Sequence, residues 1–185
     1  MKTELKHIAN IQTGVFAKPV AKGDIAYLQP KYFDELGKLT VNLEPDLNSV
    51  GISEKHILKQ GDVIFAAKGS KNFAARFDLE DMSAAASTSF FVIRIFEENI
   101  LPEYLTWYLN HQTTMKYLKS FARGTSIASI SKEVLNDLEI IIPSLEKQHL
   151  IFKIDDLRSA ERQITMKLLS LKQALNQQQL YNALT

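Results

Sequence analysis

The sequence predicts an α+β fold, in which a globular domain over residues 1–143 precedes one long C-terminal helical region over residues 144–185. Three observations support this prediction. Short apolar runs bounded by turn residues are typical of buried strands. Pro102 opens an amphipathic segment with helical spacing. From Leu145 to the last residue, neither Pro nor Gly interrupts a sustained heptad pattern.

The globular part is predicted to consist mainly of short strands joined by turns. Apolar runs and alternations indicate strands at residues 25–28, 63–67, 90–95 and 138–142, and a strand or short helix at residues 5–11. The turn residues Gly61-Asp62 precede the run at 63–67, and Pro143 ends the last strand. Residues 31–51 are rich in turn residues and are expected to be irregular.

One helix is expected to begin at Pro102, because proline fits the first turn, where its missing N–H group is not needed. Apolar residues supply the inner face of this helix: Leu101, Tyr104, Leu105, Tyr108, Leu109, Met115, Leu118 and Phe121. The segment Arg123-Gly124-Thr125-Ser126 is expected to end it.

The C-terminal helix carries a narrow apolar seam. Its positions alternate in steps of four and three residues: Leu150, Ile154, Leu157, Glu161, Ile164, Leu168, Leu171, Leu175, Gln178 and Asn182. Seven of the ten are aliphatic, which is the pattern of a coiled coil and predicts packing against another helix. The alternative is a helix that packs back on its own domain. Glu161 is discordant, since a buried charge needs a partner.

Composition limits the class of protein. The formal net charge of +1 gives no global signal for nucleic acid, and the chain contains no cysteine. The lack of cysteine excludes disulfides, thiolate metal sites and Cys nucleophiles, and it fits a reducing compartment. The first seven residues lack the apolar core of a signal peptide, and no apolar run is long enough to cross a membrane. We therefore expect a soluble cytoplasmic protein with no membrane partner.

Motifs for catalysis are missing from the sequence. It contains neither a Walker-type phosphate loop nor a dinucleotide fingerprint. The four histidines are scattered, without metal-ligand spacing. Pro45-Asp46 could begin a nuclease motif, but no Glu-x-Lys follows it, and no serine stands in a nucleophile elbow. We therefore predict no catalytic residue, no metal site and no cofactor.

Two basic segments suit binding to phosphate groups. Residues 111–132 hold Lys116, Lys119, Arg123 and Lys132 without an acidic residue, and residues 68–76 hold two further lysines and one arginine. Loops rich in Ser, Thr, Asn and Gly can bring backbone N–H groups and hydroxyls to an anion beside the cations. The alternative is ordinary solvated lysines, because residues 1–143 contain 16 Lys and Arg against 17 Asp and Glu.

Three stretches carry a family resemblance. They are residues 8–14 with 23–28, residues 60–70, and the run of Gly124-Thr125-Ser126-Ile127, Ile130-Ser131, Leu135, Leu138-Glu139-Ile140-Ile141-Ile142-Pro143 and Leu145-Glu146-Lys147-Gln148. On these residues the chain resembles half of a specificity subunit of a Type I restriction-modification system, over nearly its whole length. It departs from the family pattern at Ser144, where a second proline is usual. It also contains one recognition domain and one conserved helix, where the full subunit has two of each.

The resemblance implies a function without catalysis by this chain. A target recognition domain of this family binds one half of a split site in double-stranded DNA, and a modification subunit docks beside it and methylates adenine. A restriction subunit joins indirectly, through the modification subunit. A single domain with a single seam helix would restore the arrangement as an antiparallel homodimer on a palindromic bipartite site. The 33 residues from Leu150 to Asn182 would span roughly 50 Å, more than one turn of DNA.

The resemblance also directs attention to the residues that would contact DNA. We expect base contacts from two polar loops, Lys68, Gly69, Ser70, Lys71, Asn72 and Arg123, Gly124, Thr125, Ser126, with Lys116 and Lys119 on phosphates. Arg123 is the best single candidate for guanine, since arginine pairs with both O6 and N7. Its alternative role is electrostatic, as a cation at the C-terminus of the preceding helix.

Two other readings of the sequence remain open. The chain could be a truncated or exchangeable half of a longer specificity subunit that is inert alone. It could also be an unrecognised nuclease or hydrolase with a dimerisation helix, which metal-dependent turnover by the isolated protein would indicate.

Overall fold

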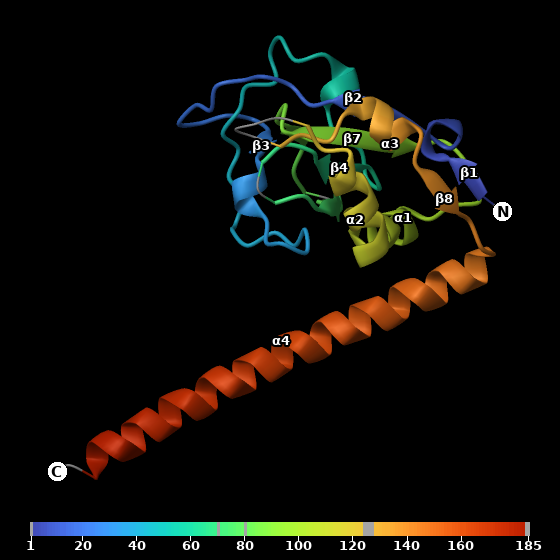
Figure 1. Ribbon diagram of the computed structural model, residues 1–185. Coiled ribbons are helices and arrows are strands. Elements are labelled where there is room, and N and C mark those ends of the chain that lie inside the picture. Colours follow the sequence, from blue (N-terminus) through green and yellow to red (C-terminus); the bar gives the residue numbers. More distant parts are fainter. Residues whose placement is uncertain (1, 70, 80, 124–127, 184–185) are drawn as a thin grey trace.

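A four-stranded antiparallel sheet forms the centre of the structure. The computed structural model describes residues 2–69, 71–79, 81–123 and 128–183 (Figure 1). The sheet has the strand order β2-β7-β4-β5. These strands are Ala9–Thr13 (β2), Phe90–Ile95 (β7), Val63–Ala66 (β4) and Ala74–Arg76 (β5). Two smaller pairs flank the sheet, antiparallel Lys2–Glu4 (β1) with Glu139–Ile141 (β8), and parallel Ala26–Leu28 (β3) with Ala84–Ala86 (β6).

Four α-helices complete the described chain. They are Pro102–Asn110 (α1), Gln112–Ser120 (α2), Lys132–Asn136 (α3) and Leu145–Asn182 (α4). Short 3-10 turns occur at Leu5–His7, Pro30–Tyr32 and Glu54–His56. Between Pro30 and Glu54 the chain is otherwise irregular, as predicted. The predicted strand at residues 90–95 matches β7, and the predicted mixture of strands, helices and a long terminal helix is confirmed.

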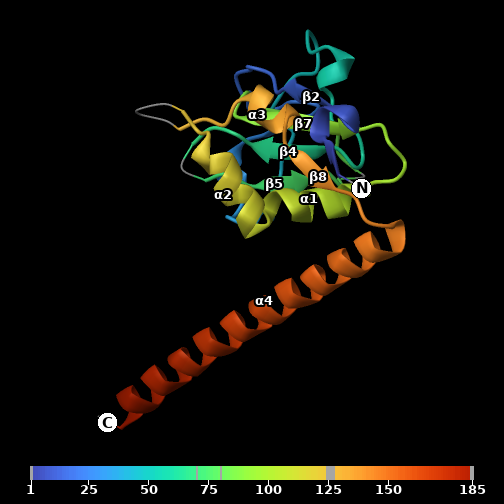
Figure 2. The same ribbon diagram turned by 45° about the vertical axis from the view of Figure 1, so that its right-hand side comes forward.

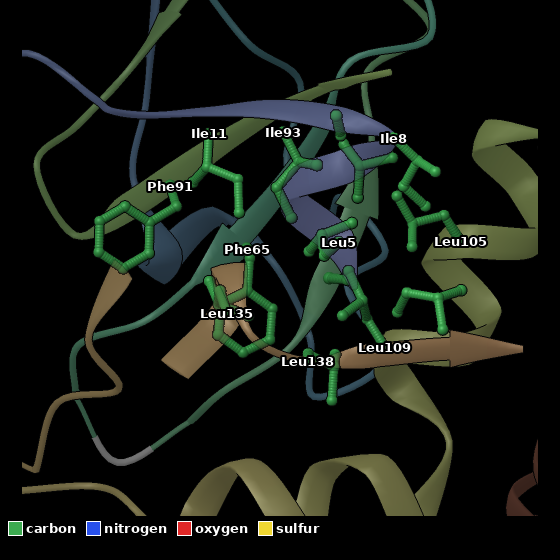
Figure 3. Close-up of a cluster of buried hydrophobic side chains, with 14 of the residues drawn as sticks. Leu5, Ile8, Ile11, Phe65, Phe91, Ile93, Leu105, Leu109, Leu135 and Leu138 are labelled. Atoms are coloured by element: carbon green, nitrogen blue, oxygen red, sulfur yellow. The ribbon is translucent and has the colours of Figure 1, made fainter. Parts of the chain in front are cut away.

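Both faces of the sheet are buried, which explains the continuous apolar run in β4. Val63 and Phe65 point into a core shared with Leu105 and Leu109 of α1, where Ile93 and Leu5 also pack (Figure 3). Ile64 and Ala66 point into a second core on the opposite face. Successive side chains of a strand point to opposite faces of the sheet. When both faces are buried, every position of the strand is therefore apolar.

An aromatic cluster closes the second core. The Phe73 and Phe90 rings meet edge to face at 5.9 Å, and Phe33 from the irregular segment lies 5.4 Å and 5.8 Å from them between ring centroids. Such offset contacts add to the stabilisation that burial of the rings already provides. The cluster therefore fixes part of the otherwise irregular segment against the sheet.

The single helix predicted after Pro102 is two helices in the structure. His111, with φ −61° and ψ 137°, is extended, and its Nδ1 accepts a hydrogen bond from the N–H of Thr113 to begin α2. Just before the break, the side-chain amide of Asn110 bonds both the N–H and the carbonyl of Ala74, at 2.7 Å and 2.8 Å. Phe121, expected on the inner face, is 46% exposed because it follows the end of α2.

Helix α4 leaves the domain as a straight rod beside α1 (Figures 1 and 2). Gln148 in its first turns is fully buried, and Ile151 packs on the main core. From Ala160 to Ala183 every residue is exposed, so this part of α4 does not pack on its own domain. Among the described residues, no helix combines the length and the hydropathy needed to span a membrane.

Candidate nucleic-acid interface

Four loop segments meet at one end of the strands of the central sheet. Thr13 ends β2 opposite Phe91, and Ala66 ends β4 opposite Phe90 at the start of β7. Strand β5 begins at the same end, since Ala74 pairs with Phe65. In an antiparallel sheet, the loop after one strand therefore lies beside the loop before its neighbour. We call this region the loop edge; its four described segments are residues 14–17, residues 67–69 with 71–72, residues 87–89, and residue 123 with 128–130.

Backbone hydrogen bonds join these segments into one surface. The N–H of Gly14 donates to the carbonyl of Phe90 at 3.0 Å, and that of Ala67 donates to Ser89 at 2.9 Å. The N–H of Ile130 in turn donates to Ala67 at 3.0 Å. The loop edge is therefore a connected backbone network, and its members are held in place relative to one another.

The described parts of the two polar loops expected to contact DNA lie side by side. Ser129 forms β-bridges with both Lys68 and Arg123. The Ser129 N–H donates to the Arg123 carbonyl at 2.9 Å, and the Arg123 N–H donates to Ser129 at 3.0 Å. The side chains of Lys68 and Arg123 are exposed. Gly69 has φ 114°, which favours glycine, and its N–H approaches the Ala128 carbonyl at 3.4 Å. Ser70, Gly124, Thr125 and Ser126 lie outside the described residues.

The remaining predicted contacts line a cleft of about 670 Å³ beside the loop edge. Lys71 and Asn72 approach it from one side, and Lys116 and Lys119 of α2 from the other. The Asn72 amide donates to the Ala66 carbonyl at 2.9 Å, so in this conformation it also fixes its own loop. Glu35 lines the cleft as well, and its carboxylate lies 3.6 Å from the Lys71 ammonium. Since both side chains are exposed, a phosphate can replace that carboxylate at little cost.

Positive charge gathers at the loop edge, although basic and acidic residues are nearly equal in number over residues 1–143. The four segments that reach it, residues 11–23, 63–77, 82–96 and 111–132, contain no Asp or Glu. Two of their arginines are already engaged elsewhere: Arg76 pairs with Asp78 and Glu103, and Arg94 pairs with Asp62. The lysines and Arg123 at the loop edge and its cleft thus form a local basic region that net charge does not reveal.

Arg123 lies beyond the end of α2. That helix ends at Ser120, and the N–H groups of Phe121 and Ala122 donate to its last carbonyls, Leu118 at 3.2 Å and Lys119 at 3.1 Å. The backbone around Arg123 instead pairs with Ser129 in an extended arrangement. The position of Arg123 is therefore set by the loop edge as much as by the helix.

Sequence reasoning missed several residues of this surface. The turn Ser87-Thr88-Ser89 accepts a hydrogen bond from Ala67 through the carbonyl of Ser89, and Ser129 pairs with both Lys68 and Arg123. The hydroxyl of Ser87 is buried and, in the described part of the chain, has no hydrogen-bond partner. The run Ser-Thr-Ser directly before a strongly apolar strand was a usable signal, because hydroxyl-rich strand ends are common at polar loops.

The predicted partner-helix positions form an open stripe along α4. All eight are exposed: Leu150, Ile154, Leu157, Glu161, Ile164, Leu168, Leu171 and Leu175. The least exposed of the seven aliphatic members, Ile154, still shows 42% of its surface. Glu161 is solvated here, so its charge needs no partner in the isolated chain. An apolar stripe of this length in water is typical of a surface that another helix covers.

Comparisons with known proteins agree with the observed architecture. Residues 2–177 match the family described as the Type I restriction modification DNA specificity domain. An S subunit of a Type I restriction-modification system from M. genitalium is 15% identical, with a TM-score of 0.58 over 85% of this chain and 38% of its own. The HsdS subunit from Thermoanaerobacter tengcongensis is 23% identical, with a TM-score of 0.65 over 89% and 43%.

A chain from a structure on complex assembly and conformational transition of the type I R-M system is 17% identical, with a TM-score of 0.60 over 94% of this chain and 40% of its own. No curated protein matches. The chain thus spans about two fifths of the length of the solved relatives. At these identities the likeness to solved structures establishes the fold.

Proposed function

Because the chain belongs to the family of the Type I restriction modification DNA specificity domain, we propose that it recognises DNA sequence within a Type I restriction-modification system. The loop edge would recognise one half-site. The observation that supports it is that Lys68 and Arg123 are held together by the backbone network of the loop edge, with the three lysines of the adjoining cleft beside them. Such a surface can fix phosphates with lysines and present an arginine to base edges.

The chain would act through a partner, without chemistry of its own. Members of this family provide specificity, and we assign adenine methylation to a modification subunit that docks near α4 and the adjoining domain surface. A restriction subunit would join through that modification subunit. The modification subunit would take a flipped adenine, while the loop edge holds the neighbouring base pairs.

The seam of α4 supports an antiparallel homodimer. Self-pairing would cover the exposed aliphatic stripe and place two identical recognition domains at opposite ends of the helical pair. Two-fold symmetry then requires a palindromic, bipartite DNA target. The 38 residues of α4 extend about 57 Å at 1.5 Å per residue, so the two half-sites could lie on successive turns of DNA.

A second candidate is pairing with a different half-subunit. The observation in its favour is that solved relatives are more than twice as long as this chain, which covers 38% to 43% of them. A different partner helix would present a different reader, and the target would then be bipartite but asymmetric.

Methylation mapping separates these possibilities. We would co-express the chain with a candidate adenine methyltransferase subunit from the same source and map methylated adenines by direct sequencing. A palindromic split motif that requires this chain is the expected result. An asymmetric motif would establish the different-half alternative. No new methylation, despite a stable complex, would contradict the proposed function.

Two variants test the surfaces involved. Substitution of Lys71, Lys116 and Lys119 by Ala should weaken DNA binding at every sequence and lower the slope of log K against log salt by about one per lysine. Leu171→Glu, on the seam, should give monomers in sedimentation and abolish the motif. Its matched control is Leu169→Glu, also exposed on α4 but off the seam, which should remain dimeric and active.

A further inference from the structure

Phe16 is held away from every core of the protein. Its side chain is 81% exposed, against 51% for Phe96 and 46% for Phe121, the next most exposed phenylalanines of the described chain. Exposure of an aromatic ring forgoes the stabilisation that its burial would provide. The ring of Phe16 is therefore free to contact a ligand from the solvent, and the surroundings of the ring decide which kind of ligand it fits.

The backbone on both sides of Phe16 is pinned by one buried hydroxyl. Tyr27, only 5% exposed, donates from its hydroxyl to the carbonyl of Val15 at 2.8 Å. The same hydroxyl accepts from the N–H of Ala17 at 3.3 Å. The residues before and after Phe16 are thus tied to a single point inside the protein, and the ring between them projects outward.

This clamp is anchored to the loop edge. The N–H of Val15 donates to the Ala86 carbonyl at 2.8 Å, and Gly14 is so close to the same turn that an added Cβ would lie 2.2 Å from the Ser87 carbonyl oxygen. Only glycine fits there without displacing backbone. Phe16 is therefore an extension of the surface that carries Lys68 and Arg123, and in Figure 1 the dark-blue segment after β2 extends beyond the sheet.

The charges within the segment that carries Phe16 favour an anionic ligand. The segment from Gly14 to Gly23 contains Lys18 and Lys22, both exposed, and no acidic residue. An exposed aromatic ring flanked by cations and continuous with a basic surface matches the needs of duplex DNA, where lysines hold the phosphates while an apolar side chain enters between base steps.

We propose that Phe16 is a DNA-contacting wedge that stacks on, and partly unstacks, a base step of the bound duplex. This inference rests on the proposed function and assigns a further specificity-determining residue to the same surface. The ring reads the deformability of a base step, which differs between sequences, and so contributes recognition without a hydrogen bond to a base. A flexible pyrimidine–purine step beside the half-site is the expected position.

The test compares Phe16→Ala with Val50→Ala, a matched control that shortens a 91% exposed apolar side chain outside the loop edge. The probe is a pool of 40-base-pair duplexes with a random centre, enriched on the wild-type chain. Phe16→Ala should bind the enriched pool roughly 5- to 150-fold more weakly, the range for loss of one stacked aromatic side chain. Its salt slope should equal that of the wild type, because no cation is removed. Val50→Ala should bind like the wild type.

A fluorescent variant checks the contact directly. Phe16→Trp keeps a stacking ring, and the wild-type chain, whose single tryptophan is Trp107, supplies the background. DNA should quench the new fluorescence and shield it from acrylamide. Wild-type affinity for Phe16→Ala, or unchanged acrylamide access in Phe16→Trp with DNA bound, would overturn the wedge while the lysine-to-alanine variants still report DNA binding. A wild-type chain that enriches no duplex would overturn the proposed function together with the wedge.

Discussion

The residues Gly61-Asp62, part of a stretch that resembles specificity subunits, have a structural task. Gly61 has φ 82° and closes the turn before β4. The Asp62 carboxylate, 2% exposed, accepts from the N–H of Lys59 at 2.8 Å and from two nitrogens of Arg94 at 2.8 Å and 2.6 Å. The hydrogen bond to this carboxylate raises the pKa of Arg94. This motif therefore joins the turn before β4 to strand β7 through an ion pair whose carboxylate is buried and whose guanidinium is partly buried.

We expect Asp62→Asn to lower the free energy of unfolding by about 3 kcal/mol, because it leaves the guanidinium of Arg94 partly buried without its counter-charge. Urea unfolding followed by circular dichroism would measure the loss. Glu139→Gln is the matched control, since it removes an exposed carboxylate that lies 3.4 Å from Lys2. It should cost less than about 1 kcal/mol. Equal losses in the two variants would show that burial of the Asp62 pair adds nothing.

His56 should make the fold sensitive to mild acid. Its Nδ1 is buried and, among the described residues, lacks a hydrogen-bond partner. Burial, and secondarily the positive charge of Lys55, lowers the pKa of His56 below its ordinary value of 6.5. The unfolded chain therefore takes up the proton first, and stability falls as pH drops through about 6.5 toward the lower folded pKa. His56→Gln should reduce the drop in melting temperature between pH 7.5 and pH 5.5. His149→Gln, at an exposed position, should leave the drop unchanged.

At the scale of elements, the sequence predicted the strands and the helix that have a strong local pattern of apolar residues. The apolar runs of β4 and β7 and the uninterrupted seam of α4 were recognisable because each pattern extends over the whole element. Strands β5 and β6 were missed, since Ala74-Ala75-Arg76 and Ala84-Ala85-Ala86 have low strand propensity. Small side chains suit these positions because all except Arg76 are buried in a crowded interior.

The candidate site was predicted only in part for a similar reason. Lysines and polar loops can be read from the sequence, whereas their adjacency depends on the pairing of Lys68 and Arg123 with Ser129. The clamp at Phe16 depends on Tyr27, whose hydroxyl position only the fold reveals. Likewise, the break between α1 and α2 follows from the bonds of Asn110 to β5, which no helical periodicity encodes.

The side chain of Gln148 connects the start of α4 to the domain, and we call its set of hydrogen bonds the latch. Its side-chain amide donates to the carbonyls of Asn99 at 2.8 Å and Pro143 at 2.9 Å, and its oxygen accepts from the N–H of Leu101 at 2.9 Å. The side chain is completely buried. These three hydrogen bonds, two to the segment before α1 and one to Pro143, explain why a polar residue is buried in the first turns of the helix, and they fasten the start of α4 to the domain.

We expect Gln148→Ala to destabilise the domain by about 2 kcal/mol, because it strands a buried N–H group and carbonyls. Faster hydrogen exchange at the amide of Leu101 should accompany the loss and would locate it at the latch. Gln173→Ala, at an exposed position of α4, is the control and should change neither quantity. If Leu101 remained protected in Gln148→Ala, the latch would not be what holds the two parts together.

For the whole molecule, the latch at Gln148 and the length of α4 together predict that this helix sets the distance between the two DNA half-sites. In the proposed antiparallel homodimer, the latch fixes each domain to its helix, and the shared seam fixes the two helices to each other. The distance between the two loop edges then depends on the number of residues in the helix. The spacer between the two half-sites is therefore a property of α4 and should change independently of the bases that the loop edge recognises.

Duplication of residues 168–174 tests this relation, because one added heptad repeats two seam leucines and preserves the seam. The helix gains about 10.5 Å, which corresponds to about three base pairs at 3.4 Å each. Methylation mapping should return the same half-sites separated by a spacer up to about three base pairs longer. A seven-residue Gly-Ser insertion at the same place adds equal chain length without rigid rise, so it should yield no defined spacer. An unchanged spacer after the heptad duplication would mean that the partner subunits, and not α4, set the separation of the domains.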